Sequence, residues 1–183
     1  MIGRIAGTLL VKAPPALLVD VGGVGYELEA PMSTFYNLPA VGSAVVLHAH
    51  LVVREDAQLL YGFGTEAERA LFRQLLKVSG VGAKLALVIL SGVSAQELIA
   101  IVADGDAARL VRIPGIGRKT AERLILELRE PFAKLASVPE SALAPRADAP
   151  GDAAAALEAL GYKPTEVRAA LRDLPAGDSS EDL

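Results

Sequence analysis

The sequence predicts a multidomain β-then-α protein: an N-terminal OB-type β-barrel, a central all-α domain and a small helical bundle at the C-terminal end. Three observations support this. Short runs rich in Val, Leu and Ile, bounded by Gly, Pro or Asn, fill the first 64 residues and are typical of strands. From Thr65 the apolar positions recur with the 3.6-residue period of a helix. A segment rich in Pro, Ala and Ser then precedes the last apolar stretch.

The predicted barrel covers residues 1–64. Gly22 and Gly23 provide the positive φ angles of a tight hairpin between the second and third strands. Five short strands are about what an OB-type barrel needs, although another small antiparallel sheet is an alternative. The expected strands are residues 2–12, 16–21, 25–30, 44–53 and 58–63.

The predicted helical domain covers residues 65–136. Thr65 and Glu68 form a capping-box pattern, and the pattern recurs at Ser94 and Glu97. Asp106 is expected to cap a short helix. About five helices are expected before Pro131, and the last has an apolar stripe at helical spacing, made of Ala121, Leu124, Ile125 and Leu128.

The C-terminal part is predicted as a flexible linker, residues 137–151, and a helical segment, residues 152–183. Asp152 can cap a helix that carries Leu157 and Leu160, and a second helix from Pro164 presents Val167 and Leu171 on one face. A further helix-start pattern begins at residue 179, which suggests an incomplete bundle lacking its third helix. A frayed acidic tail is the alternative.

Composition restricts the classes of function. The 183 residues have a formal net charge of −4 and contain no cysteine. The middle part, residues 65–130, is the basic one, with 10 cations and 8 anions. Without cysteine there is no disulfide framework and no thiol nucleophile, which fits a reducing compartment, so we expect a cytoplasmic protein. Residues 30–53 carry no Asp, Glu, Lys or Arg, but prolines, glycine and histidines interrupt them, so no membrane association is expected.

An internal duplication is the most informative feature. Residues 75–86 align with residues 110–121 at an offset of 35, with five identical positions. Each copy has the pattern of a helix, a hairpin with two glycines, and a second helix whose first turn carries a lysine, Lys84 or Lys119. Glycines allow close approach of a ligand, and the free amides of a helix N-terminus bind anions such as phosphate. Two copies indicate a polymer backbone, which would be bound without base reading.

Other interpretations of these glycines are weaker. The first copy lacks the third glycine of a dinucleotide-binding fingerprint, and the second has Ile113 and Arg118 where a P-loop places its glycines. No nucleotide hydrolysis is expected. Two ordinary helix C-caps remain the structural alternative.

Two features of the barrel segment have ordinary explanations. Glu55 and Asp56 form an acidic tip between apolar strands, and such a tip is usually a solvated turn. Near DNA, the repulsion between a carboxylate and a phosphate ~4 Å apart is about 1 kcal/mol in water and roughly 4 kcal/mol at an effective dielectric constant of ~20. His48 and His50 share one strand face but lack a nearby carboxylate at ligand spacing, so no metal is expected. The aromatic residues are too few and scattered for base stacking.

Four segments together closely resemble the RuvA family, whose members act in branch migration of Holliday junctions. They are Met1-Ile2-Gly3-Arg4, Val21-Gly22-Gly23-Val24-Gly25-Tyr26, residues 53–63 and Pro114-Gly115-Ile116-Gly117-Arg118-Lys119-Thr120-Ala121-Glu122-Arg123, and the match spans residues 1–174. The paired hairpins resemble tandem helix-hairpin-helix motifs. The resemblance implies a non-catalytic homotetramer, or an octamer, that holds an open, square-planar four-way junction. It also implies roles in DNA recombination, DNA repair and the SOS response to DNA damage.

The resemblance also implies particular site residues and partners. Glu55 and Asp56 match the acidic pin at the junction centre. The C-terminal segment matches the domain that binds the RuvB motor ATPase, through Leu157, Leu160, Val167 and Leu171, and the nuclease RuvC is a further partner. No cofactor is implied. The implied DNA-binding residues are Gly80, Gly82, Lys84, Gly115, Gly117, Arg118, Lys119 and Arg123.

Two rival functions stay open. Paired hairpins often accompany nucleases and glycosylases, but the sequence shows no carboxylate cluster with metal-site spacing. A protein-only adaptor that acts through the C-terminal helices is the other alternative.

Overall fold

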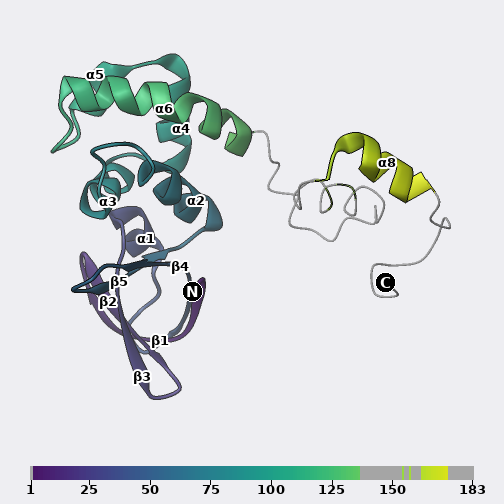
Figure 1. Cartoon of the computed structure of the whole chain (residues 1–183). Coiled ribbons are helices and arrows are strands. Elements are labelled where there is room, and N and C mark those ends of the chain that lie inside the picture. The colour runs from purple at the N-terminus through teal and green to yellow at the C-terminus, as the bar shows by residue number, and fades with distance from the viewer. Residues whose placement is uncertain (1, 137–153, 155–156, 158–161, 173–183) are drawn as a thin grey trace. The chain divides into compact units, whose positions relative to one another are not determined.

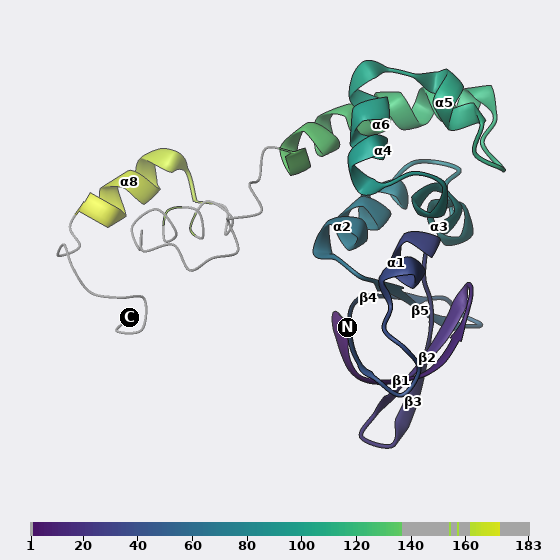
Figure 2. The same ribbon diagram turned by 180° about the vertical axis from the view of Figure 1, so that it is seen from behind.

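The computed structural model describes residues 2–136, 154, 157 and 162–172. The chain divides into two compact units, residues 1–137 and 138–183. In the first unit, a β-barrel is followed by helices that stack on one end of the barrel, as opposite views show (Figures 1 and 2).

The barrel is closed by five strands in the order β1-β2-β3-β5-β4. β4 pairs antiparallel with β1 and closes the sheet, and β3 meets β5 in a parallel pairing at Glu29 and Tyr61. This arrangement confirms the predicted OB-type barrel. The strands are β1 (Arg4–Ala13), β2 (Ala16–Val21), β3 (Val24–Glu29), β4 (Ala44–Val53) and β5 (Gln58–Phe63).

Local chemistry explains the barrel's connections. Gly22 and Gly23 have φ angles of 63° and 90°, and the Gly23 amide donates to the Asp20 carboxylate at 2.9 Å, so the predicted tight turn is confirmed. One helix, α1 (Met32–Asn37), is not predicted from the sequence. A segment of six residues is too short to show a helical period, and Pro31 at its N-cap makes no capping hydrogen bond through its side chain.

The helical part contains α2 (Glu66–Leu75), α3 (Ala83–Gly92), α4 (Ala95–Asp104), α5 (Ala107–Val111) and α6 (Arg118–Ala136). Both predicted capping boxes are present, at the starts of α2 and α4, and Asp106 caps α5 as expected. Five helices of this part begin before Pro131, as expected, but the last of them, α6, continues through the proline. The buried side chains of Leu128 and Phe132, on either side of the proline, keep this segment packed although Pro131 cannot donate a backbone hydrogen bond.

Two clusters of buried apolar side chains form the core of this unit. One fills the barrel. The other joins the helices and also includes Tyr61 and Phe63 from β5, whose ring centroids lie 5.1 and 4.8 Å from that of Phe72 on α2. Because one strand contributes to both clusters, the barrel and the helices pack as one unit. The predicted stripe on α6 is buried at Ala121, Leu124 and Leu128.

In the second unit the structure describes α8 (Pro164–Arg172), which confirms the helix expected from Pro164. Val167 is buried there, and Leu157 and Leu171 are half-buried. The predicted linker, Leu160 and the helix-start pattern at residue 179 lie outside the described residues. The incomplete bundle therefore stays a prediction.

Candidate nucleic-acid interface

The two copies of the duplicated segment fold into hairpins with the same backbone geometry. The first connects α2 to α3, and the second connects α5 to α6. Each hairpin hydrogen bond has a counterpart 35 residues further on. In each bond the amide of the first-named residue donates to the carbonyl of the second. Val78 to Leu75 (3.1 Å) corresponds to Ile113 to Leu110 (3.0 Å), and Val81 to Val78 (3.0 Å) corresponds to Ile116 to Ile113 (3.1 Å). At the start of the following helix, Ala86 to Gly82 (2.9 Å) corresponds to Ala121 to Gly117 (2.9 Å).

The glycines of each hairpin serve two different purposes. Gly80 and Gly115 both have φ near 86°, a left-handed conformation that favours glycine and reverses the chain. Gly82 has φ −89° and ψ 171°, a conformation open to any residue, and φ of Gly117 is not positive. A Cβ atom added at Gly82 or Gly117 would meet nothing within 4 Å. Nothing in the described structure therefore requires glycine at these two positions.

The start of α3 offers free amide donors. Its N-cap is Gly82, which makes no side-chain cap, so the first-turn amides of α3 stay open to an external acceptor. This contrasts with α2 and α4, whose capping boxes satisfy the corresponding amides. The start of α3 is thus suited to an anion.

Cations surround the hairpins. Lys84 and Lys119 are exposed and have no hydrogen-bond or ion-pair partner among the described residues. Arg118 has an 88% exposed side chain and pairs with Glu122 at 3.0 Å. Each of these side chains is accessible to a phosphate strand.

The two hairpins contact each other. The Arg123 guanidinium donates to the Ser79 carbonyl at 3.1 Å, across 44 residues of sequence. A Cβ at Gly115 would lie 3.3 Å from Cδ1 of Leu85, the residue after Lys84. Arg123 therefore ties the second copy to the first hairpin, a role that the sequence pattern alone does not reveal.

The predicted acidic tip is present as the turn between β4 and β5. The Arg54 amide donates to the Ala57 carbonyl at 2.8 Å and closes this turn. Glu55 and Asp56 are exposed and form no ion pair within the described part of the chain. In both views this turn and the turn between α5 and α6 extend to the same side of the unit (Figures 1 and 2).

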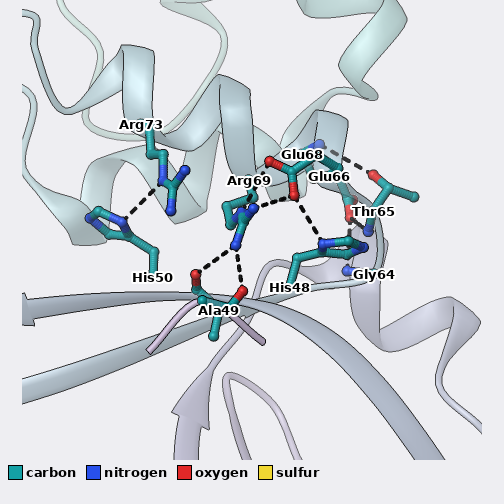
Figure 3. A network of polar contacts seen from close by, with 10 residues as sticks. His48, Ala49, His50, Gly64, Thr65, Glu66, Glu68, Arg69 and Arg73 are labelled. Atoms are coloured by element: carbon teal, nitrogen blue, oxygen red, sulfur yellow. Dashed lines mark hydrogen bonds and ion pairs between the residues drawn. The ribbon is translucent and has the colours of Figure 1, made fainter. Parts of the chain in front are cut away.

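A polar network joins the barrel to α2 (Figure 3). Arg69 donates to the Ala49 carbonyl at 3.2 Å and to the Gly3 carbonyl, and it pairs with Glu66. Glu66 also contacts His48 at 2.9 Å. The sequence shows no local pattern for Arg69, because its carbonyl partners are 66 and 20 residues away.

The two histidines of β4 face α2. His50 accepts a hydrogen bond from Nε of Arg73 at 3.3 Å and lies edge-on to Phe72. Burial, and then the positive charges of Arg73 and Arg69, lower the pKa of His50 below its usual value of 6.5. Both histidines thus have protein partners at the junction between barrel and helices.

In the described residues, no single helix is long and apolar enough to cross a bilayer. The helices α3 and α4 meet those criteria together, but their axes are bent by 97°.

Two helix-hairpin-helix units in tandem, joined to an OB-like barrel, place this chain in the class of tandem helix-hairpin-helix proteins. Comparison with protein families narrows the class. The RuvA N terminal domain matches residues 1–62, the SAM-like helix-hairpin-helix tandem matches residues 72–130, and the RuvA C-terminal domain matches residues 148–183.

Whole-length relatives agree with these matches. Three are proteins named Holliday junction branch migration complex subunit RuvA. The relative from Thioalkalivibrio sulfidiphilus is 55% identical over 100% of this chain and 95% of its own length. Those from Leptothrix cholodnii and Cupriavidus necator are 58% and 56% identical, over 96% and 100% of this chain and 91% and 94% of theirs. The chain belongs to the RuvA family.

Proposed function

We propose that this protein binds four-way DNA junctions without reading their sequence, holds them open and square-planar, and acts as a non-catalytic subunit in branch migration. The names of its relatives support the role, since each is called a subunit of the Holliday junction branch migration complex. The hairpin geometry supports the mode of binding, because amides and cations recognise phosphates rather than bases.

The observation that carries the proposal is the open space at Gly82 and Gly117. Neither backbone conformation nor internal packing requires glycine there. A sugar-phosphate strand that approaches the backbone closely explains both glycines at once. It also explains why the N-cap of α3 has no side chain to satisfy the adjacent amides.

The acidic tip gives the proposed site its preference for junctions. In a homotetramer, four copies of Glu55 and Asp56 would meet at the crossover and repel the phosphates there, which guides the strands apart. The hairpins would hold the arms. The protein would then present the junction to the RuvB motor through its C-terminal segment and work alongside RuvC.

The C-terminal segment contributes to this proposal with one adjustment. Val167 is 2% exposed, so its side chain stabilises its own unit. We propose that Leu157, Leu160 and Leu171 contribute to binding the motor, together with exposed residues beside Val167 on α8.

The experiment compares binding to a four-way junction and to linear duplex DNA, with the size of each complex measured. If a tetramer neutralises about eight phosphates, affinity should fall by on the order of 10⁴ between roughly 50 and 200 mM salt. Replacing Glu55 and Asp56 with lysine should reduce the preference for junctions while duplex binding is kept. A flat salt response, or an unchanged preference in the pin variant, would contradict the proposal.

The same preparation tests the nuclease alternative. Labelled junctions are incubated with the protein and Mg²⁺, and the products are separated under denaturing conditions. We expect intact strands, and cleavage would overturn the non-catalytic role.

A further inference from the structure

Two exposed cations lie before the hairpins rather than after them. Lys77 precedes Gly80 by three residues, and Arg112 precedes Gly115 by three residues. The two are equivalent at the offset of 35. Neither belongs to the set of DNA-binding residues that the family resemblance implies.

The pattern of ion pairing singles these residues out. Residues 65–130 contain 10 cations. In the structure the side chains of six of them make a hydrogen bond or an ion pair: Arg69, Arg73, Arg109, Arg118, Arg123 and Arg129. Within the described residues, the four without a side-chain hydrogen bond or ion pair are Lys77, Lys84, Arg112 and Lys119. These four are two repeat-related pairs, so the same two positions stay unpaired in both copies.

The hairpin geometry places one free cation on each side of the turn. Gly80 reverses the chain with its φ of 86°, so Lys77 comes before the reversal and Lys84 after it. Gly115 separates Arg112 from Lys119 in the same way. Phosphates recur every ~3.4 Å of helix axis along one strand. A strand whose phosphate meets the hairpin amides therefore has a neighbouring phosphate on each side of that contact.

Each of the two cations also lines a surface groove that contains another cationic residue, an arginine. Lys77 shares a groove of about 490 Å³ with Arg73 and His50. Arg112 shares a groove of about 270 Å³ with Arg109, next to Pro114 of the second hairpin. Arg73 adds a positive charge to the first groove and strengthens its attraction for an anion, whereas Arg109 in the second groove already pairs with Glu97 at 3.7 Å.

We propose that Lys77 and Arg112 form a second pair of phosphate contacts, so that each hairpin holds its DNA strand by cations on both sides of the amides. This inference rests on the proposed function. The competing explanation is structural: both residues are at helix C-terminal ends, where a cation interacts favourably with the helix dipole. The two explanations predict different results for DNA binding.

The test uses the full chain with Lys77→Gln, Arg112→Gln and the double substitution. Binding to a four-way junction and to linear duplex is measured by fluorescence anisotropy from roughly 50 to 200 mM salt. For every bound protomer, each lost contact should weaken both complexes by about tenfold at ~50 mM salt and lower the log–log salt slope by about 0.9. The charge-preserving variants Lys77→Arg and Arg112→Lys should bind like the parent.

Controls separate the possible outcomes. Lys163→Gln removes an exposed charge in the other unit and should leave DNA binding unchanged. Thermal melting checks that each variant is folded. If the glutamine variants melt at a lower temperature but keep the parent's affinity and slope, the cations only stabilise their helices and the inference is wrong.

The failure of this inference can be told apart from failure of the proposed function. A parent protein that binds neither DNA overturns both. A parent that binds, and that loses affinity with Lys84→Gln but not with Lys77→Gln or Arg112→Gln, overturns only the second pair of contacts.

Discussion

Adding one methyl group at Gly82 or Gly117 should abolish DNA contact at that hairpin without harming the fold. The backbone of Gly82 is already in an extended conformation, and a Cβ there meets no protein atom within 4 Å. Gly82→Ala and Gly117→Ala therefore place the methyl group only in the space that a bound strand would occupy.

The expected magnitudes can be worked out separately for stability and binding. Alanine reduces the freedom of the unfolded chain, which stabilises by about 0.4–1 kcal/mol, but it is a poorer N-cap than glycine by a similar amount. The free energy of unfolding should thus change by less than about 1 kcal/mol. A hydrogen bond to a charged phosphate contributes about 1.5–3 kcal/mol. Loss of one such bond at each altered hairpin should weaken binding by about 10- to 100-fold.

Fluorescence anisotropy with four-way and linear DNA measures the binding, and urea unfolding measures the stability. Gly64→Ala is a matched control at the other end of α2, because its Cβ would make an ordinary 3.6 Å contact with Glu68. It should leave both quantities close to those of the parent. If Gly82→Ala and Gly117→Ala bind DNA as tightly as the parent, no strand approaches these glycines and the proposed mode of binding is refuted.

Three further substitutions test the fold that supports the site. Gly7→Ala places a Cβ 2.0 Å from the Asp20 carbonyl oxygen on the paired strand, so stability should fall by about 1–3 kcal/mol or more, and an unchanged melting temperature would contradict this packing. Arg69→Gln leaves two carbonyls and Glu66 without their partner, which should lower the free energy of unfolding, measured in urea, by about 1–3 kcal/mol. The same change should weaken binding to a four-way junction more than binding to linear duplex. Because the pKa of His50 is lowered, the unfolded chain binds more protons in mild acid. The free energy of unfolding should therefore decrease as the pH falls through 6.5 and level off below the pKa of His50 in the folded protein. Unfolding measured at several pH values should show that His50→Gln removes this part of the pH dependence.

Features built from neighbouring residues were determined by the sequence alone. The capping boxes at Thr65 and Ser94 and the turn at Gly22 depend on hydrogen bonds or φ angles within about four residues. The two hairpins were predictable for the same reason, since a repeated pattern of glycines and apolar positions imposes the same local turn twice. The short helix α1 was the exception, because it lacks both a side-chain cap and a visible period.

Only the tertiary structure decided which charges and surfaces stay free. The family resemblance implies Arg123 as a DNA contact, but the fold brings the Ser79 carbonyl to it from 44 residues away. Within residues 65–130 the fold also pairs six cations and leaves Lys77, Lys84, Arg112 and Lys119 without a partner among the described residues. Ion pairing and the open space beside a glycine depend on atoms that are distant in sequence, and no local pattern encodes where those atoms lie.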